Sequence, residues 1–263
     1  MKIKTKTTLL LALLSFAGIS LANGTPVHFF SKEEESEIIE LMKKELITHP
    51  EILIEAGKEI QVKQLEQRNK DMIKAVVNNS GALIGDRETP TYGPKNAKIA
   101  VIEFFDYQCI WCARLAPEME NIISSNPQVL YVFKEWPVFG QRWENSILAA
   151  KTGLKIWKQK GDVSYLKYHN AVYASGHNEG KLEVKDISIA GKRILSDHSN
   201  DKEIQKELND TDILANKIGI KGTPAIIVMP TEGASEKNVT IFSGFVNADT
   251  LQKAIRKAQY PND

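Results

Sequence analysis

The stretch Val101-Ile102-Glu103-Phe104-Phe105-Asp106-Tyr107-Gln108-Cys109-Ile110-Trp111-Cys112 decides the fold, because an apolar β-branched and aromatic run ends there at two cysteines. Residues 113–124 continue with a helical pattern. The order predicts a strand, a Cys-x-x-Cys pair and a helix. Unpaired N–H groups and the helix dipole favour a thiolate at the helix start. We predict that Cys109 is an exposed nucleophile and that Cys112, one turn deeper, is shielded and closes a short disulfide with it.

Two structural interpretations compete with this redox site. Cys109 and Cys112 are the only cysteines among 263 residues, so one chain cannot supply four thiolates to a structural zinc ion. A structural disulfide across so short a loop would constrain the unfolded chain little. A copper site stays open as an alternative, since soft thiolates select Cu(I).

The N-terminal residues are typical of a secretory signal peptide. Lys2, Lys4 and Lys6 precede an apolar run at residues 9–19, and Ser20-Leu21-Ala22 offers small residues for cleavage. We predict cleavage after residue 22; an uncleaved anchor is the alternative, although the run is too short to span a membrane. Export would place the cysteine pair in an oxidising compartment, where such a pair serves catalysis.

The composition is that of a globular protein, with 42% hydrophobic and 25% charged residues. The formal net charge of the whole chain is +1, and loss of the three lysines with the signal peptide leaves about −2. No basic excess indicates nucleic acid as a partner. The five histidines do not cluster in the sequence. We expect them at the surface or in packing, with metal binding as the alternative, and we predict no cofactor.

Residues 23–80 form a predicted helical region. Ser31-Lys32-Glu33-Glu34 has the spacing of a capping box, and a second, long helix is expected at residues 50–78. A narrow apolar stripe on a long charged helix usually packs against a partner helix. We therefore predict self-association through residues 27–80, as a dimer or a trimer. The alternative is a helical hairpin that folds back on the same chain.

The remaining chain has the pattern of one α/β domain at residues 97–263. It follows a segment at residues 81–96, rich in glycine and proline, that is predicted as a linker and first edge segment. The expected strands occupy residues 99–105, 129–134, 225–229 and 239–243. The expected helices after the cysteines occupy residues 145–160, 164–174, 184–195, 201–218 and 248–259. The pattern predicts a mixed sheet core interrupted by a helical insertion at about residues 141–218.

Three side chains near the cysteines could support the chemistry. Glu103 is the one acidic residue in its strand, and a buried carboxylate has a raised pKa, so it could relay the proton of Cys112. Lys134 ends the next strand and could pair with Glu103, which would hold that pKa down; a plain structural salt bridge is the alternative. Trp111 is expected to be exposed, where it would contact substrate or shield the disulfide.

Three motifs carry a resemblance to a known family. The segment from Glu103 to Cys112, Lys134-Glu135-Trp136-Pro137 and Gly222-Thr223-Pro224-Ala225 resemble the DsbA-like thiol–disulfide oxidoreductases of the bacterial periplasm, over residues 97–259. His49-Pro50-Glu51-Ile52-Leu53, in a secreted helical segment, resembles the N-terminal oligomerisation region of the subgroup that includes the ScsC proteins.

The resemblance implies a thioredoxin fold with an inserted helical subdomain and Cys109 as the nucleophile. It also implies a cis Thr223–Pro224 bond beside the cysteines, with Thr223 and Pro224 lining the substrate groove. Ile110-Trp111 replaces the Pro-His pair typical of strongly oxidising members, which removes one source of thiolate stabilisation. Threonine before the proline, together with an oligomerisation region, is more similar to disulfide isomerases than to simple oxidases.

These observations predict a periplasmic enzyme that forms and isomerises disulfide bonds in exported proteins. Its expected partners are unfolded or misfolded exported proteins and a membrane redox protein. The alternatives are a plain oxidase that a membrane partner reoxidises, a copper-binding thiolate protein, and a chaperone that acts without its cysteines.

Overall fold

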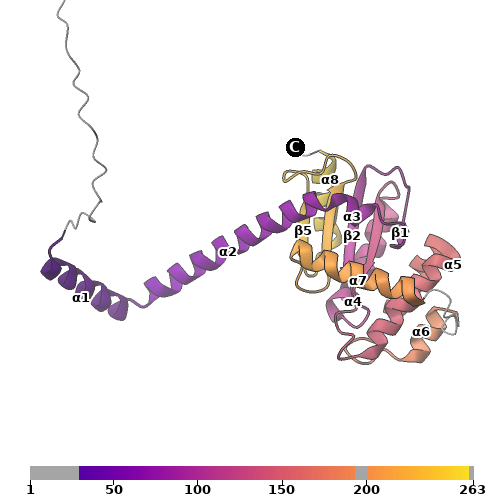
Figure 1. Ribbon diagram of the computed structural model, residues 1–263, viewed down its shortest axis with the longest axis horizontal. Coiled ribbons are helices and arrows are strands. Elements are labelled where there is room, and N and C mark those ends of the chain that lie inside the picture. Colours follow the sequence, from indigo (N-terminus) through magenta and orange to yellow (C-terminus); the bar gives the residue numbers. More distant parts are fainter. Residues whose placement is uncertain (1–29, 193–200, 261–263) are drawn as a thin grey trace, which may run out of the picture. The chain divides into compact units, whose positions relative to one another are not determined.

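The computed structural model describes residues 30–192 and 201–260 (Figure 1). The chain divides into two compact units, Met1–Ile60 and Gln61–Asp263, which are described separately below. The predicted signal peptide lies outside the described residues. None of the described helices combines the length and the apolar composition that crossing a membrane requires.

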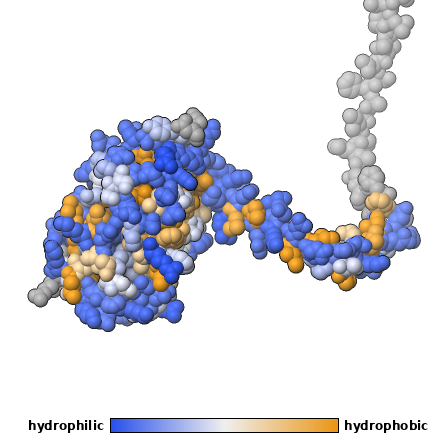
Figure 2. Space-filling model, turned by 180° about the vertical axis from the view of Figure 1, so that it is seen from behind, coloured by the Kyte–Doolittle hydropathy of each residue, from blue (hydrophilic) through white to orange (hydrophobic). Residues whose placement is uncertain are grey.

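The first unit holds α1 (Lys32–Thr48) and the beginning of α2 (Glu51–Asn78). The predicted capping box is confirmed: the Ser31 hydroxyl accepts the N–H of Glu34 at 3.2 Å, and the Glu34 carboxylate accepts the N–H of Ser31 at 2.7 Å. No residue of α1 is buried. Figure 2 shows apolar side chains at the surface of this helical segment. They include Ile38, Ile39, Leu41, Met42, Ile47, Ile52, Leu53 and Ile54, all exposed.

The second unit contains the end of α2 and the remaining elements, which carry the labels of Figure 1. Its further helices are α3 (Ser80–Ile84), α4 (Ile110–Ser125), α5 (Glu144–Ala174), α6 (Val184–Ala190), α7 (Asp201–Ile218) and α8 (Ala248–Gln259). Its strands are β1 (Thr91–Tyr92), β2 (Ile99–Phe105), β3 (Leu130–Glu135), β4 (Ala225–Pro230) and β5 (Thr240–Ser243).

The five strands form one sheet in the order β1-β3-β2-β4-β5. Strands β2 and β3 are parallel, because α4 crosses over between them, and the other pairs are antiparallel. The central strands β2, β3 and β4 are buried along their whole length. Their uninterrupted apolar runs reflect a sheet that is covered on both faces.

Alternate side chains of the central strands enter two separate cores. Phe105 and Phe133 face the core formed with α4, α5 and α8. Ile102 and Phe104 face the core to which α7 and the end of α2, through Met72, contribute. Burial of each such side chain stabilises the fold by about 1.5–3 kcal/mol. The end of α2 is therefore part of the second unit's core.

The predicted helical insertion between β3 and β4 is confirmed. Its first helix, α5, is interrupted at Gly161, which has φ 74° and ψ −166°, a conformation that favours glycine. The break matches the gap between the two helices predicted at residues 145–160 and 164–174. The helix predicted at residues 184–195 is shorter, since α6 ends at Ala190, and residues 193–195 lie outside the described residues.

The segment predicted as a linker carries local structure of its own. It contains most of α3, whose Leu83 is fully buried, and β1, which pairs with β3 at the sheet edge. The boundary between the two compact units lies inside α2, after Ile60. The functional domain limits at residues 80 and 96 stay a prediction.

Candidate active site

Cys109 occupies the N-cap of α4, directly after the turn that follows β2. Its backbone is extended, with φ −81° and ψ 119°, and its carbonyl accepts the N–H of Ala113 at 3.0 Å, which opens the helix. The Cys109 N–H donates to the carbonyl of Asp106 at 3.0 Å. The predicted order of strand, cysteine pair and helix is therefore confirmed, with Cys109 at the helix N-terminus.

The surroundings of Cys109 lower the pKa of its thiol to about 6. The largest cause is a hydrogen bond from the Cys112 thiol, and burial opposes it. The Thr223 side chain and the backbone N–H groups of Trp111 and Cys112 also lower the pKa. Each of these groups stabilises a thiolate more than a neutral thiol.

The prediction that Cys109 is exposed is wrong for the free protein. Only 4% of its surface is accessible, because the segment before β4 covers it: the Cys109 thiol donates a hydrogen bond to the Thr223 carbonyl oxygen at 3.3 Å. Both cysteines are free thiols in the structure. The Cys109 side chain is therefore largely covered in the free protein.

Cys112 is fully buried one turn into α4, as the sequence predicts. Its pKa is raised well above the usual range, first by burial, then by its hydrogen bond to Cys109 and by the charges of Cys109 and Glu103. The two thiols therefore have opposite pKa shifts. One can hold a negative charge near neutral pH while the other keeps its proton.

Glu103 is buried on β2, on the same side of the strand as Phe105. Burial and, second, the charge of Cys109 raise its pKa to about 8, in the predicted direction. Among the described residues, its Oε2 atom has no hydrogen-bond partner. This carboxyl group can exchange a proton near neutral pH.

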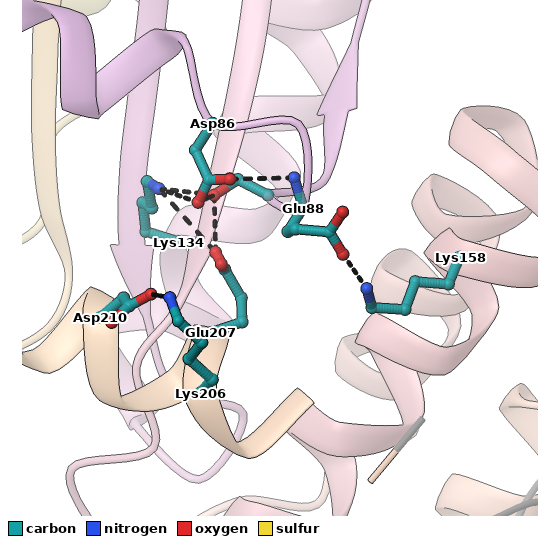
Figure 3. Close-up of polar contacts among 8 residues, drawn as sticks. Asp86, Glu88, Lys134, Lys158, Lys206, Glu207 and Asp210 are labelled. Carbon is teal, nitrogen blue, oxygen red and sulfur yellow. Dashed lines mark hydrogen bonds and ion pairs between the residues drawn. The ribbon is translucent and has the colours of Figure 1, made fainter. Parts of the chain in front are cut away.

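The predicted pairing of Lys134 with Glu103 is wrong. Lys134 lies beside Phe104 in the parallel register of β2 and β3, and neighbouring residues of a strand point to opposite faces. Lys134 Nζ instead donates to the Thr89 hydroxyl at 2.5 Å and lies 3.8 Å from Asp86 Oδ2 and 3.9 Å from Glu207 Oε1 (Figure 3). The two strands are adjacent, which the predicted pairing required, but the two side chains point to opposite faces of the sheet.

This buried ion cluster has a structural effect. The Thr89 hydroxyl lies 2.6 Å from Glu207 Oε1, so the segment before β1 and helix α7 share the Lys134 charge. Burial lowers the pKa of Lys134, and the carboxylates of Glu207 and Asp86 oppose that shift. The cluster attaches α7, and with it the end of the helical insertion, to the sheet. A catalytic role of Lys134 stays a prediction, although the contact with Glu103 on which that role depended is not present.

The segment before β4 reaches the cysteines through Thr223 and Pro224. The Thr223–Pro224 peptide bond is cis, as the family resemblance implies. Besides its carbonyl contact with Cys109, Thr223 has a buried hydroxyl that helps to lower the pKa of the Cys109 thiol. Trp111 is 49% exposed beside this site, and the Arg114 guanidinium lies 4.5 Å from its ring centre.

Sequence reasoning missed two polar residues that hold the active-site turn. Asp106 accepts the N–H of Gln108 at 2.8 Å, the N–H of Phe139 at 2.9 Å and the hydroxyl of Ser146 at 2.7 Å. Gln108 Oε1 accepts the N–H of Gly180 at 2.9 Å. Both side chains are buried, so the turn is fixed to the helical insertion. Their position in the sequence, between an apolar strand and the two cysteines, could have indicated that they hold the active-site turn.

A third missed residue is Glu135, at the end of β3. Its Oε1 accepts hydrogen bonds from the hydroxyls of Tyr107 at 3.1 Å and Tyr165 at 2.8 Å. Burial raises the pKa of Glu135 well above its usual range. Burial lowers the pKa of the neighbouring His169, which packs among aromatic rings, to about 3. This cluster holds Tyr107 two residues before Cys109.

Comparison with known proteins identifies the class of this site. The sequence model of a family described as Thioredoxin matches residues 86–248. BcfH of Salmonella enterica Typhimurium has a similar structure, with a TM-score of 0.76 and 33% identity over 86% of this chain and 96% of BcfH. ScsC of Proteus mirabilis, in a transitional conformation, is 26% identical with a TM-score of 0.57, over 87% of this chain and 98% of that one.

A Rickettsia bellii (strain RML369-C) protein named as a protein-disulfide oxidoreductase is 26% identical over 191 residues, which cover 66% of this chain and 67% of that protein. The fold and the dithiol site define a redox protein, and the chain belongs to the thioredoxin family. Within that family it is a thiol–disulfide oxidoreductase of the DsbA/ScsC type.

Proposed function

We propose that this enzyme is exported to the periplasm, where it forms and isomerises disulfide bonds in other exported proteins through Cys109 and Cys112. The observation that carries the proposal is the placement of the two thiols at the start of α4, with Cys109 at the N-cap and Cys112 fully buried one turn further on. This placement shifts the two thiol pKa values in opposite directions. A thiolate is the attacking species in disulfide exchange, and the resolving thiol must stay protonated until it is needed.

In isomerisation, the Cys109 thiolate attacks one sulfur of a wrong client disulfide. A bond forms between that sulfur and Cys109 Sγ, and the other client sulfur leaves as a thiolate. A second client thiolate then attacks the mixed disulfide, forms a new client disulfide and releases the Cys109 thiolate. No net electrons are transferred in this cycle.

In reduction, Cys112 ends the mixed disulfide instead. Its thiol loses a proton to Glu103, and its sulfur attacks Cys109 Sγ and releases the client sulfur as a thiolate. The two enzyme cysteines are thereby oxidised by two electrons to the Cys109–Cys112 disulfide, and the client disulfide is reduced. The pKa of Glu103, raised to about 8 by burial, makes it a suitable proton acceptor for this buried thiol. The reverse sequence forms disulfides in clients, and a membrane redox partner would reset the pair.

The surface around Cys109 supports binding of an unfolded client. Trp111, two residues after Cys109, is a large apolar side chain that the structure leaves exposed. In this proposal Trp111 contacts the client, and Thr223 and Pro224 bind the client backbone beside the captured sulfur. Exposed apolar patches of this kind are typical of binding surfaces.

Self-association through residues 27–80 is a further part of the proposal, and residues 27–29 lie outside the described residues. Helix α1 has no buried residue and exposes a series of large apolar side chains (Figure 2). Burial of that surface between copies would stabilise a dimer or trimer. Two or more active sites could then surround one misfolded chain.

The experiment that tests the proposal is refolding of a scrambled-disulfide substrate. The intact protein should restore activity to the substrate, and Cys112→Ala should accumulate mixed disulfides on Cys109. A double variant, Leu41→Glu with Leu53→Glu, should weaken both assembly and isomerisation while simple dithiol exchange continues; Lys58→Glu, also exposed on α2, is its charge control. Absence of trapped mixed disulfides would refute the proposed chemistry.

A plain oxidase is the second candidate, favoured by the lowered Cys109 pKa. A stabilised thiolate makes the reduced form more stable and the disulfide more oxidising. The redox state of the cysteines in cells separates the two: mostly oxidised protein supports the oxidase, and mostly reduced protein supports the isomerase.

A further inference from the structure

A groove beside Thr223 and Pro224 is partly built by helix α2. One cavity of about 240 Å³ is lined by Arg68 of α2, Lys221 and the Thr223–Pro224 segment. A second cavity of about 550 Å³ shares Arg68 and Lys221 with the first and adds Lys217. We call these two cavities, which share part of their lining, the α2 groove. All of its lining residues belong to the second compact unit.

The α2 groove carries an excess of positive charge. Arg68, Lys217 and Lys221 come from three different segments and are all exposed. Within residues 30–192 and 201–260, none of the three has an ion-pair partner. Asp71 is the one acidic residue of the lining, and its Oδ1 already accepts a hydrogen bond from Gln67 at 2.8 Å. The groove can therefore attract a negative group that the chain itself does not supply.

One of the three positive charges has a structural role within the fold. Lys217 lies in the last turn of α7, where a cation stabilises the helix dipole. Arg68, however, lies in the interior of α2, and Lys221 follows the end of α7 in the segment leading to Thr223. The inference therefore depends on Arg68 and Lys221.

The position of the groove relative to Cys109 indicates what could occupy it. The Thr223 carbonyl oxygen is 3.3 Å from Cys109 Sγ, and Thr223 and Pro224 also line the smaller cavity. A polypeptide joined to Cys109 by a mixed disulfide would have its flanking residues at the mouth of the α2 groove.

Resting on the proposed function, we propose that the α2 groove binds acidic side chains of the client polypeptide close to the cysteine that Cys109 attacks. The occupant is an extended peptide segment with aspartate or glutamate within a few residues of its cysteine. Arg68 and Lys221 contact the carboxylates, and the buried Met72 side chain forms part of an apolar floor for the client chain. The oxidoreductase thereby prefers acidic cysteine-containing segments.

The test uses the reduced full-length protein and three peptides. Each peptide has one cysteine in a disulfide with a reporter thiol, and the residues next to it are two glutamates, two glutamines or two lysines. The rate of reporter release measures attack by Cys109. Because each partly screened ion pair contributes about 0.2–1 kcal/mol, two pairs should make the glutamate peptide react about twofold to thirtyfold faster than the glutamine peptide. This ratio should approach one at about 1 M salt, where the Debye length is about 3 Å.

The double variant Arg68→Glu with Lys221→Glu should invert the order, so that the lysine peptide reacts fastest. Lys74→Glu, an exposed change on the same helix but outside the groove lining, should keep the wild-type order. The inference would be overturned if the wild-type protein reacted at equal rates with the three peptides, or if Lys74→Glu changed the order of the rates as the double variant does. Either result would leave the proposed function standing. Failure of all three peptides to react would instead overturn the proposed function.

Discussion

Replacement of Cys112 by alanine should raise the pKa of Cys109. The Cys112 thiol donates the hydrogen bond that contributes most to the lowering of that pKa to about 6. A hydrogen bond to a charged group contributes about 1.5–3 kcal/mol, and one pKa unit corresponds to about 1.36 kcal/mol, so the expected rise is about one to two units. At pH 6.5 the thiolate fraction of Cys109 should fall from about three quarters to about one quarter or less.

The assay is the rate of Cys109 alkylation as a function of pH, followed by mass spectrometry. Cys112→Ser is the matched control, because its hydroxyl keeps a donor at the same position and should raise the pKa less. Identical titrations of the alanine and serine variants would refute the hydrogen bond as the cause. A wild-type midpoint near 9.0, the reference value of the thiol, would refute the lowered pKa itself.

The same pKa has a consequence for the stability of the reduced protein. A thiol whose pKa is lower in the folded state stabilises the fold fully above its unfolded-state pKa. That contribution decreases as the pH falls and is lost below about 6. The reduced protein should therefore lose stability over this range relative to Cys109→Ser, which has no thiol to ionise.

Three further predictions concern two buried charged side chains and one glycine with a positive φ. Glu103→Gln should flatten the dependence of melting temperature on pH. The pKa of the Glu103 carboxyl group rises from 4.5 to about 8 on folding, so the native protein becomes less stable as the pH increases between those values. Parallel curves of melting temperature against pH for the wild type and the variant would contradict this. Lys134→Met should lower the free energy of unfolding by about 3 kcal/mol in denaturant titrations, since it leaves the buried Glu207 carboxylate without its cation, whereas Lys206→Met, at an exposed pair, should change it little. Gly161→Ala should destabilise by about 1–3 kcal/mol because of its φ of 74°, and Gly57→Ala, in open space within α2, should not.

Local patterns in the sequence predicted most of the elements. The apolar run at residues 99–105 is long enough for one buried strand, and Cys109 follows it at the distance that opens a helix. Ser31 and Glu34 satisfy each other's backbone groups within three residues of chain. Such features depend on neighbours in sequence, so composition and spacing are sufficient to predict them. The site residues Cys109 and Cys112 belong to this group.

Tertiary structure decided which side chains meet. The parallel register of β2 and β3 places Lys134 beside Phe104 rather than Glu103, and a shift of one residue changes the face of the sheet. Cys109 is covered by Thr223, which is 114 positions away in the chain. Pairing register and long-range packing follow from the whole set of contacts, which no local pattern encodes. The sequence by itself therefore determined the reactive pair, its helix and the carboxyl group of Glu103 as a candidate proton acceptor, and only the folded chain determined what covers Cys109 and which charged side chains line the α2 groove.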